Sequence, residues 1–316
     1  METQKPKIAM YVQRTFGDKL NATFDFIKEN WKVLLKYVTY LLLPVSLIQA
    51  LSMNGLMGMM LGTADPAVVE AMFTDSGQVV TFVSYYGLLL LISLIGTNLL
   101  GALVYTLMRL YNEREQRLSG IEFGELKPLL YRNFKRLFSL TLFAIFMMVL
   151  IGLVIGVLAS LVSSFSVLFV FLLLLLVGLL LLAPLLLWGS IYLFEDISLM
   201  KAFSKAFRLG FATWGGVVLM AIVMGFLASI LQGVTTMPWY ISILVKTFFI
   251  ASDAGSGIGT SAGYNFMLYL FGVLQAFGAY LAMIFYLVGL AYQYGHAAEK
   301  MDSVRIEEDI NHFDQL

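Results

Sequence analysis

The chain carries few of the side chains that catalytic and metal-binding sites require. Its 316 residues include no cysteine and only two histidines, His296 and His312. Thiolate metal sites, iron–sulfur clusters and cysteine nucleophiles are therefore excluded, and two histidines leave almost no ligands for haem or a multi-histidine iron centre. We expect no cofactor and no catalytic or metal-binding residue.

A stretch rich in glycine and serine, 253–263, has the composition of a phosphate-binding loop. Such loops lie between a strand and the N-terminus of a helix, where backbone N–H groups converge on the phosphates, whereas this stretch follows an apolar segment. Its serines also lack a general base, because His296 is expected on the opposite face of the membrane, about 30 Å of hydrocarbon away. We interpret 253–263 as a flexible connector.

Basic side chains at helical spacing are the candidates for ligand binding. Lys201, Lys205 and Arg208 are three or four residues apart, on one side of a helix whose other side carries leucine and phenylalanine. Such a helix suits the membrane surface, because its rings enter the acyl boundary while its basic groups meet anionic headgroups. We expect anionic lipid headgroups to contact Lys201, Lys205, Arg208, Arg132, Lys135, Arg136 and Lys246.

Other roles remain open for these charged positions. The basic helices can instead cap the bundle through protein contacts, and Lys246 can anchor its segment by extending its side chain to the membrane surface. Lys246 lies in a short apolar stretch, 240–250, which follows Pro238 and is expected to be re-entrant or interfacial. Glu195 and Asp196 precede the helix that carries Lys201, so we expect their carboxylates to cap its N-terminus.

The composition is typical of an integral membrane protein. Hydrophobic residues make up 60% of the chain and charged residues 13%, compared with roughly 45–50% and about 25% in soluble domains. Twenty basic and twenty acidic side chains give a formal net charge of zero. No basic excess is left to bind a phosphate backbone, so we expect no nucleic-acid partner.

Six apolar stretches are long enough to cross the membrane as helices, which requires about 20 residues. They cover approximately 33–61, 79–111, 137–163, 167–194, 214–235 and 264–294. Only a few serine-rich residues separate the third stretch from the fourth, so these two should form a tight hairpin. The sequence therefore predicts an all-α integral membrane protein with six transmembrane helices in three hairpins.

The distribution of lysine and arginine predicts the orientation. Connections 62–78 and 164–166 contain no basic residue, and 236–263 contains only Lys246. The other nineteen basic residues lie on the opposite side, which the positive-inside rule assigns to the cytoplasm. Both termini are expected in the cytoplasm, without a cleavable signal peptide. The absence of cysteine also fits a bacterial inner membrane.

A threefold repeat is expected along the single membrane domain, 1–316. Amphipathic stretches near 14–31, 121–137 and 197–212 each precede an odd-numbered span, with apolar residues recurring every three or four positions. We expect each to form a cytoplasmic interfacial helix at a steep angle to the span that follows. The repeat units cover about 14–120, 121–196 and 197–316, and the last includes an acidic cytoplasmic tail at about 299–316.

Small and amide side chains indicate where helices pack. Gly152 and Gly156 form a small-xxx-small pair that allows close helix approach, either within the chain or between copies. Asn98 and Gln275 are expected to bond across helices, each worth on the order of 1 kcal/mol. We assign all four residues to helix packing.

One segment resembles a known family. Residues 192–209 read Tyr-Leu-Phe-Glu-Asp-Ile-Ser-Leu-Met-Lys-Ala-Phe-Ser-Lys-Ala-Phe-Arg-Leu, and Trp214 follows. This motif resembles the recurrent signature of bacterial six-span proteins similar to the membrane domain attached to some glycerophosphoryl diester phosphodiesterases. The resemblance implies fold and location. It does not imply hydrolysis, because that chemistry belongs to a soluble barrel with metal ligands that is absent from this sequence.

These features favour a non-enzymatic protein. No nucleophile with a base, carboxylate pair or metal cluster can be assembled on one membrane face. A scaffold or accessory subunit that organises a protein partner, a second copy or lipids fits best. The alternative is a transporter or lipid-handling protein with a lateral groove between helices kinked at Pro44 and Pro184, lined by Asn98 and Gln275.

The orientation can be tested with single cysteines, because the chain has none of its own. We expect a membrane-impermeant thiol reagent to label Asp75→Cys on intact cells and to leave Lys300→Cys unlabelled until the cells are opened. The reverse pattern would contradict the assignment of both termini to the cytoplasm.

Overall fold

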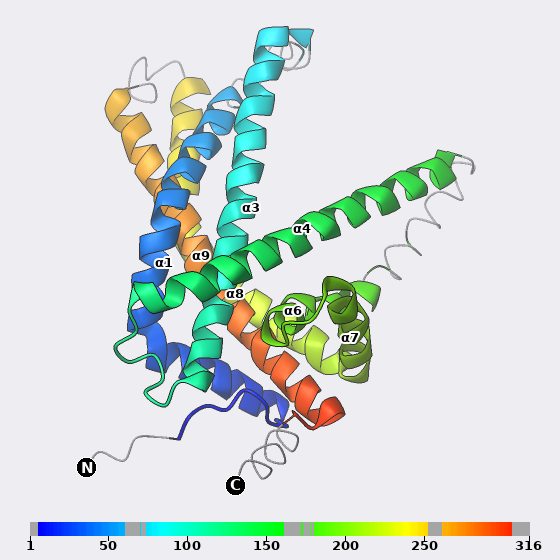
Figure 1. Cartoon of the computed structure of the whole chain (residues 1–316). Coiled ribbons are helices and arrows are strands. Elements are labelled where there is room, and N and C mark those ends of the chain that lie inside the picture. Colours follow the sequence, from blue (N-terminus) through cyan, green and yellow to red (C-terminus); the bar gives the residue numbers. More distant parts are fainter. Residues whose placement is uncertain are drawn as a thin grey trace. The chain divides into compact units, whose positions relative to one another are not determined.

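Helices account for nearly all of the chain that the computed structural model describes (Figure 1). The structure describes residues 6–60, 74–160, 180–251 and 261–304, together with positions 70, 172 and 178. Within these ranges there is no β-strand. The prediction of an all-α fold is therefore confirmed.

Five of the helices are long and apolar enough to cross a membrane. They are α1 (Phe16–Met60), α3 (Ser76–Glu113), α4 (Phe123–Ser160), α8 (Trp214–Ala251) and α9 (Ala262–Asp302). The predicted span 167–194 falls largely outside the described residues, and the described part of it contains a shorter apolar helical stretch, Leu180–Phe194. The chain is thus a multi-pass membrane protein.

The three amphipathic stretches are helical, but only the third is a separate helix. This is α7 (Leu199–Ala212), which Thr213 separates from α8 with φ −126° and ψ 26°. Stretches 14–31 and 121–137 continue without interruption into the apolar parts of α1 and α4. A separate helix is therefore seen for the third stretch alone among the described residues, where Thr213 and the following Trp-Gly-Gly have low helix propensity, and the interfacial position of the other two stretches stays a prediction.

The described residues form two compact units, although several helices contribute to both. Unit 1 contains Met1–Trp31, Gly101–Gly225 and Phe285–Leu316, and unit 2 contains Lys32–Leu100 and Phe226–Ile284. The last residues of the expected acidic tail, 305–316, and most of the glycine-rich connector, 252–260, lie outside the described residues.

Unit 1 is built around the short helix α6 (Trp188–Phe194), which contacts both α4 and α7 (Figure 1). Buried hydrogen bonds join its helices: Ser190 Oγ donates to Tyr105 Oη at 3.2 Å, and Asn133 Nδ2 donates to Thr106 Oγ1 at 2.9 Å. These two bonds pair the hydroxyl of Ser190 and the amide nitrogen of Asn133, as burial favours.

Unit 2 has a core around Trp239, which is 1% exposed and packs with Ile243 and Leu268. The indole Nε1 of Trp239 donates to Asn54 Oδ1 at 2.9 Å. α8 runs through Pro238 without ending there. The expectation that 240–250 forms a separate re-entrant or interfacial segment is therefore wrong, because buried packing of Trp239 and Ile243 keeps this stretch helical.

The close approach of α7 to the stretch before α6 gives a test of the packing in unit 1. A Cβ at Gly210 would lie 2.6 Å from Pro184 Cβ and even closer to the proline backbone. We expect Gly210→Ala to lower the free energy of unfolding by about 1–3 kcal/mol through overpacking. Thermal unfolding in detergent measures this.

The matched control is Gly124→Ala in α4, where no atom lies within 4 Å of the added carbon. We expect this change to be neutral or stabilising by up to about 1 kcal/mol, as helix propensity favours alanine. Equal melting temperatures for the two variants would contradict the contact between Gly210 and Pro184.

Candidate functional site

Asp196 is the centre of a highly charged region among the described residues of unit 1. Its carboxylate accepts hydrogen bonds from Arg109 Nη1 at 2.7 Å, Arg132 Nη2 at 3.1 Å and Arg136 Nη1 at 2.5 Å. Arg109 comes from α3, and the other two arginines come from α4. We call these four residues the Asp196 cluster. It links both helices to the connection between α6 and α7.

The backbone around Asp196 is held in place by Arg136. Arg136 Nη2 donates to the carbonyl oxygens of Tyr192 at 2.6 Å and Ile197 at 2.7 Å, and its guanidinium lies over the Tyr192 ring. Asp196 has φ 53°, in the left-handed region that aspartate tolerates better than most residues. A glycine would adopt this conformation more easily but would lack the carboxylate.

The electrostatics of the cluster favour an ionised Asp196. Burial by itself would raise the pKa of this carboxyl. The hydrogen bond from Arg109 and the positive charges of the three arginines outweigh burial, so the pKa lies below its ordinary value. Asp196 is therefore a permanent anion that the arginines share.

A second chain of charges connects α7 to the end of α9. Lys205 Nζ lies 2.7 Å from Glu195 Oε2 and 2.7 Å from Asp302 Oδ2, and Arg208 Nη2 lies 2.6 Å from Asp302 Oδ1. Burial would lower the pKa of Lys205, but its bonds to Asp302 and Glu195 raise it. Tyr294 Oη also donates to Glu195 at 2.8 Å. We call Glu195, Lys205, Asp302 and Arg208 the Lys205 chain.

These contacts correct the interpretation of Glu195 and Asp196 as helix caps. The N-cap residue of α7 is Ser198, and no side chain caps the helix there. Both carboxylates bind basic side chains instead, because the arginines of α3 and α4 and Lys205 of α7 surround them. The sequence analysis missed Arg109 and the central role of Asp196. The only feature of the sequence that could have indicated this role is the position of the acidic pair between an apolar stretch and a basic one.

The predicted headgroup contacts fall into two groups. Arg132, Arg136, Lys205 and Arg208 form ion pairs within unit 1, in the Asp196 cluster or the Lys205 chain. Pairing lowers the positive charge that these four present to a lipid. It supports the alternative in which basic helices are held by protein contacts.

The remaining three basic positions are differently placed. Lys201 is exposed on α7, and Lys135 is exposed on α4 with its ammonium 4.4 Å from the centre of the Tyr131 ring. Lys246 donates to Asn265 Oδ1 at 2.9 Å within unit 2. Lys135 and Lys201 are the two exposed candidates that form no ion pair among the described residues.

The helix-packing candidates also differ from one another. Asn98 is buried and donates to the carbonyl of Leu94 in its own helix at 2.8 Å. Gln275 has a buried Oε1 without a hydrogen-bond partner among the described residues. A Cβ at Gly152 or Gly156 would meet no described atom within 4 Å. The glycine pair is therefore open to another helix.

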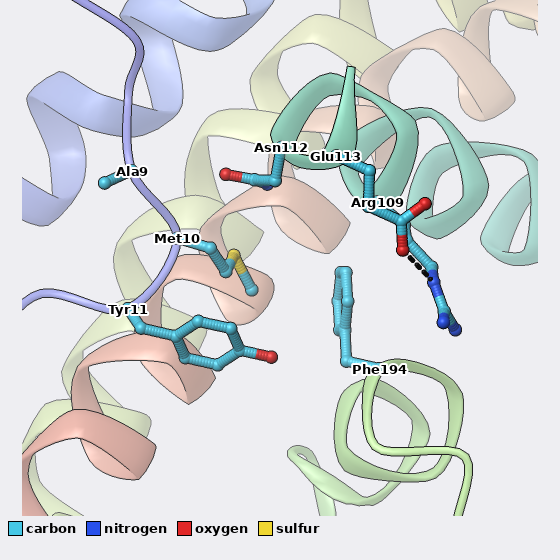
Figure 2. A pocket seen from close by; sticks show the side chains of 7 residues that line it. All are labelled: Ala9, Met10, Tyr11, Arg109, Asn112, Glu113 and Phe194. Carbon is cyan, nitrogen blue, oxygen red and sulfur yellow. Dashed lines mark hydrogen bonds and ion pairs between the residues drawn. The ribbon is translucent and has the colours of Figure 1, made fainter. Parts of the chain in front are cut away.

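A cavity of about 430 Å³ lies in unit 1 beside the Asp196 cluster. Figure 2 shows Met10 and Tyr11 of the N-terminal segment on one side, Arg109 and Glu113 of α3 on another, and Phe194 of α6 below them. Arg109 Nε donates to Glu113 at 2.8 Å, as the dashed line marks. Since this guanidinium is already paired with two carboxylates, the cavity suits a neutral rather than an anionic guest.

The N-terminal segment forms its wall of the cavity because it is tied to two helices. Lys7 Nζ donates to the carbonyl of Arg114 at 2.6 Å, and Ile8 N donates to Tyr111 Oη at 3.3 Å. A Cβ at Gly295 would collide with the carbonyl oxygen of Met10. The segment therefore depends on a glycine in α9 for its close approach.

Comparison with known proteins gives no family for this chain. No family model, curated protein or solved structure matches it significantly. The resemblance of residues 192–209 to the membrane domain of phosphodiesterases therefore stays a prediction.

The Asp196 cluster predicts a specific loss of stability. We expect Asp196→Asn to lower the free energy of unfolding by about 2 kcal/mol, because three guanidinium groups lose the anion that they share. Glu113→Gln is the matched control: this carboxylate bonds Arg109 but is 55% exposed, so its loss should change stability by less than about 0.5 kcal/mol. Chemical unfolding in detergent compares the two.

The same variant should change the acid dependence of stability. A carboxyl with a lowered folded-state pKa stabilises the fold fully above its ordinary pKa, about 4, and loses that contribution as the pH falls through the folded value. The wild-type protein should therefore lose more stability than Asp196→Asn as the pH drops below about 4. Parallel pH profiles would contradict the shared-anion account.

Proposed function

We propose that this chain is a non-enzymatic protein of a bacterial inner membrane that works as a scaffold or accessory subunit. It would have six spans in three repeated hairpins, with both termini in the cytoplasm. Its role would be to organise a partner, and the partner would dock on α4 as a transmembrane helix, either from another protein or from a second copy of this chain.

The observation that supports this proposal is the isolation of α4. In the most apolar 18 residues of α4, 6% are buried by the described residues, compared with 39% in α3 and 39% in α9. Large apolar side chains are exposed on every side of the helix, among them Phe146, Met148, Ile151 and Leu153. Lipid can cover such a surface, but only another helix fits closely at a glycine pair.

The position of the glycines fits helix docking. Gly152 and Gly156 are four residues apart and so share one face of α4. Small residues at this spacing let two helix backbones approach closely, so that van der Waals contacts replace lipid contacts. The docking face would thus be centred on this pair.

One observation favours the alternative, a lipid-handling protein with a polar groove. In unit 2, Asn54 Nδ2, Thr236 Oγ1 and Gln275 Oε1 are buried without hydrogen-bond partners among the described residues. Unpaired polar atoms are unfavourable at membrane depth, so these three would gain from a polar guest. They belong to three different helices, which gives the guest several partners.

The docking proposal predicts a change in assembly. We expect the wild-type chain, extracted mildly from its native membrane, to run at a mass larger than one chain plus detergent. Replacing both glycines with leucine (Gly152→Leu and Gly156→Leu) should reduce the complex to a single chain while leaving its melting temperature nearly unchanged, because these side chains meet no described neighbour. Native mass spectrometry measures the masses.

Val154→Leu is the matched control, since Val154 is 58% exposed and lies on another side of α4. It should keep the complex. A wild-type chain that is already single, or a double variant that keeps the complex, would contradict docking at the glycine pair.

A further inference from the structure

Lys19 is a buried cation near the start of α1, and its surroundings are unusual. The residue is 4% exposed. Its ammonium donates to Gln293 Oε1 at 2.6 Å, and Gln293 Nε2 in turn donates to Thr213 Oγ1 at 3.3 Å. Both partners are neutral. Of the three N–H groups of the ammonium, one has a hydrogen-bond partner among the described residues.

No carboxylate of the described residues forms an ion pair with Lys19. The charged group that acts on it has the same sign, because the Lys300 ammonium repels that of Lys19. Lys19, Lys300 and Arg14 in turn all act on His296. A buried charge without a counter-ion is strongly unfavourable, so a concentration of basic groups around one calls for an anion.

The start of α8 adds to the positive potential. A Cβ at Gly216 would lie 3.3 Å from Lys19 Nζ and 3.0 Å from Gln293 Nε2, so both side chains lie directly against the first turn of this helix. The hydroxyl of Thr213 donates backward to the carbonyl of Leu209 at 2.9 Å rather than capping α8. A helix N-terminus attracts anions and repels cations, yet here it meets a lysine.

We propose that Lys19, Gln293 and the first turn of α8 form a binding site for a phosphate-type anion. The Lys19 ammonium would supply the central charge, and Gly215 and Gly216 would let the ligand approach the backbone N–H groups of the helix start. This inference goes beyond the scaffold proposal and does not depend on it.

The groups around this site suit an oxyanion. His296 Nδ1 accepts a hydrogen bond from the backbone N–H of Arg14 at 3.0 Å, so the neutral ring carries its hydrogen on Nε2 and can donate it. Lys300 is exposed and pairs with no described residue, so it can contact an incoming ligand. Ammonium, imidazole and backbone donors together match the acceptor oxygens of a phosphate.

Two sources of ligand share this chemistry: the phosphate of an anionic lipid headgroup and free phosphate. The test uses the full-length chain in detergent with two probes. Inorganic phosphate is titrated while the melting temperature is followed, with chloride at equal ionic strength as the reference. Lipid nanodiscs of phosphatidylcholine with or without phosphatidylglycerol test the headgroup, and retained lipid is measured by native mass spectrometry.

We expect saturable stabilisation by at least one probe in the wild-type chain. Lys19→Met should weaken that binding about tenfold or more, because a charged hydrogen bond is lost. In the absence of ligand the same variant should melt at or above the wild-type temperature, since it removes an uncompensated buried charge. A residue with a merely structural role would show the opposite, a lower melting temperature with unchanged binding.

Lys28→Met is the control, because Lys28 is an exposed lysine of the same helix and should bind either probe as the wild type does. If Lys19→Met does not fold, the exposed Lys300→Gln takes its place, with an expected weakening of about threefold to fivefold.

The two probes distinguish a soluble ligand from a lipid. Stabilisation by phosphate alone assigns a soluble phosphate ligand, and retention of phosphatidylglycerol alone assigns a lipid headgroup. No effect of either probe on the wild type, or an equal effect on the wild type and Lys19→Met, would overturn the site.

Discussion

The shared carboxylate of Asp196 is the interaction on which the arrangement of unit 1 depends. Three arginines from two long helices meet this one anion, and Arg109 also pairs with Glu113. Without a shared anion, the three guanidinium groups of α3 and α4 would repel one another. Asp196 supplies that anion, and so the connection between α6 and α7 is held beside these two helices. The Lys205 chain then attaches α7 to the end of α9.

This internal pairing changes how the basic residues of the chain should be understood. Most of the basic side chains that the sequence suggests for lipid binding form ion pairs between helices instead. Lys135 and Lys201 are exposed, and buried Lys19 has no carboxylate partner among the described residues. The number of basic residues is therefore a poor guide to how much positive charge this chain offers to a ligand.

The sequence predicted the long helices, because their apolar length exceeds what a membrane crossing needs. It also predicted which stretches are amphipathic. It could not predict the partner of Arg109, since Asp196 lies 87 residues away and only packing brings the two together. Nor could it predict that α8 continues through Pro238. A proline normally suggests the end of a helix, but α8 continues, and Trp239, the residue after the proline, is buried in the core of unit 2.

The uninterrupted length of α4 has a mechanical consequence. One uninterrupted helix carries both the arginines that bind Asp196 and, some twenty residues later, the glycine pair. A helix without a hinge transmits a rotation or a tilt from one end to the other, because bending it would break backbone hydrogen bonds. A tilt of the apolar end of α4 would therefore also displace Arg132 and Arg136, which bind Asp196 at the other end of the same helix.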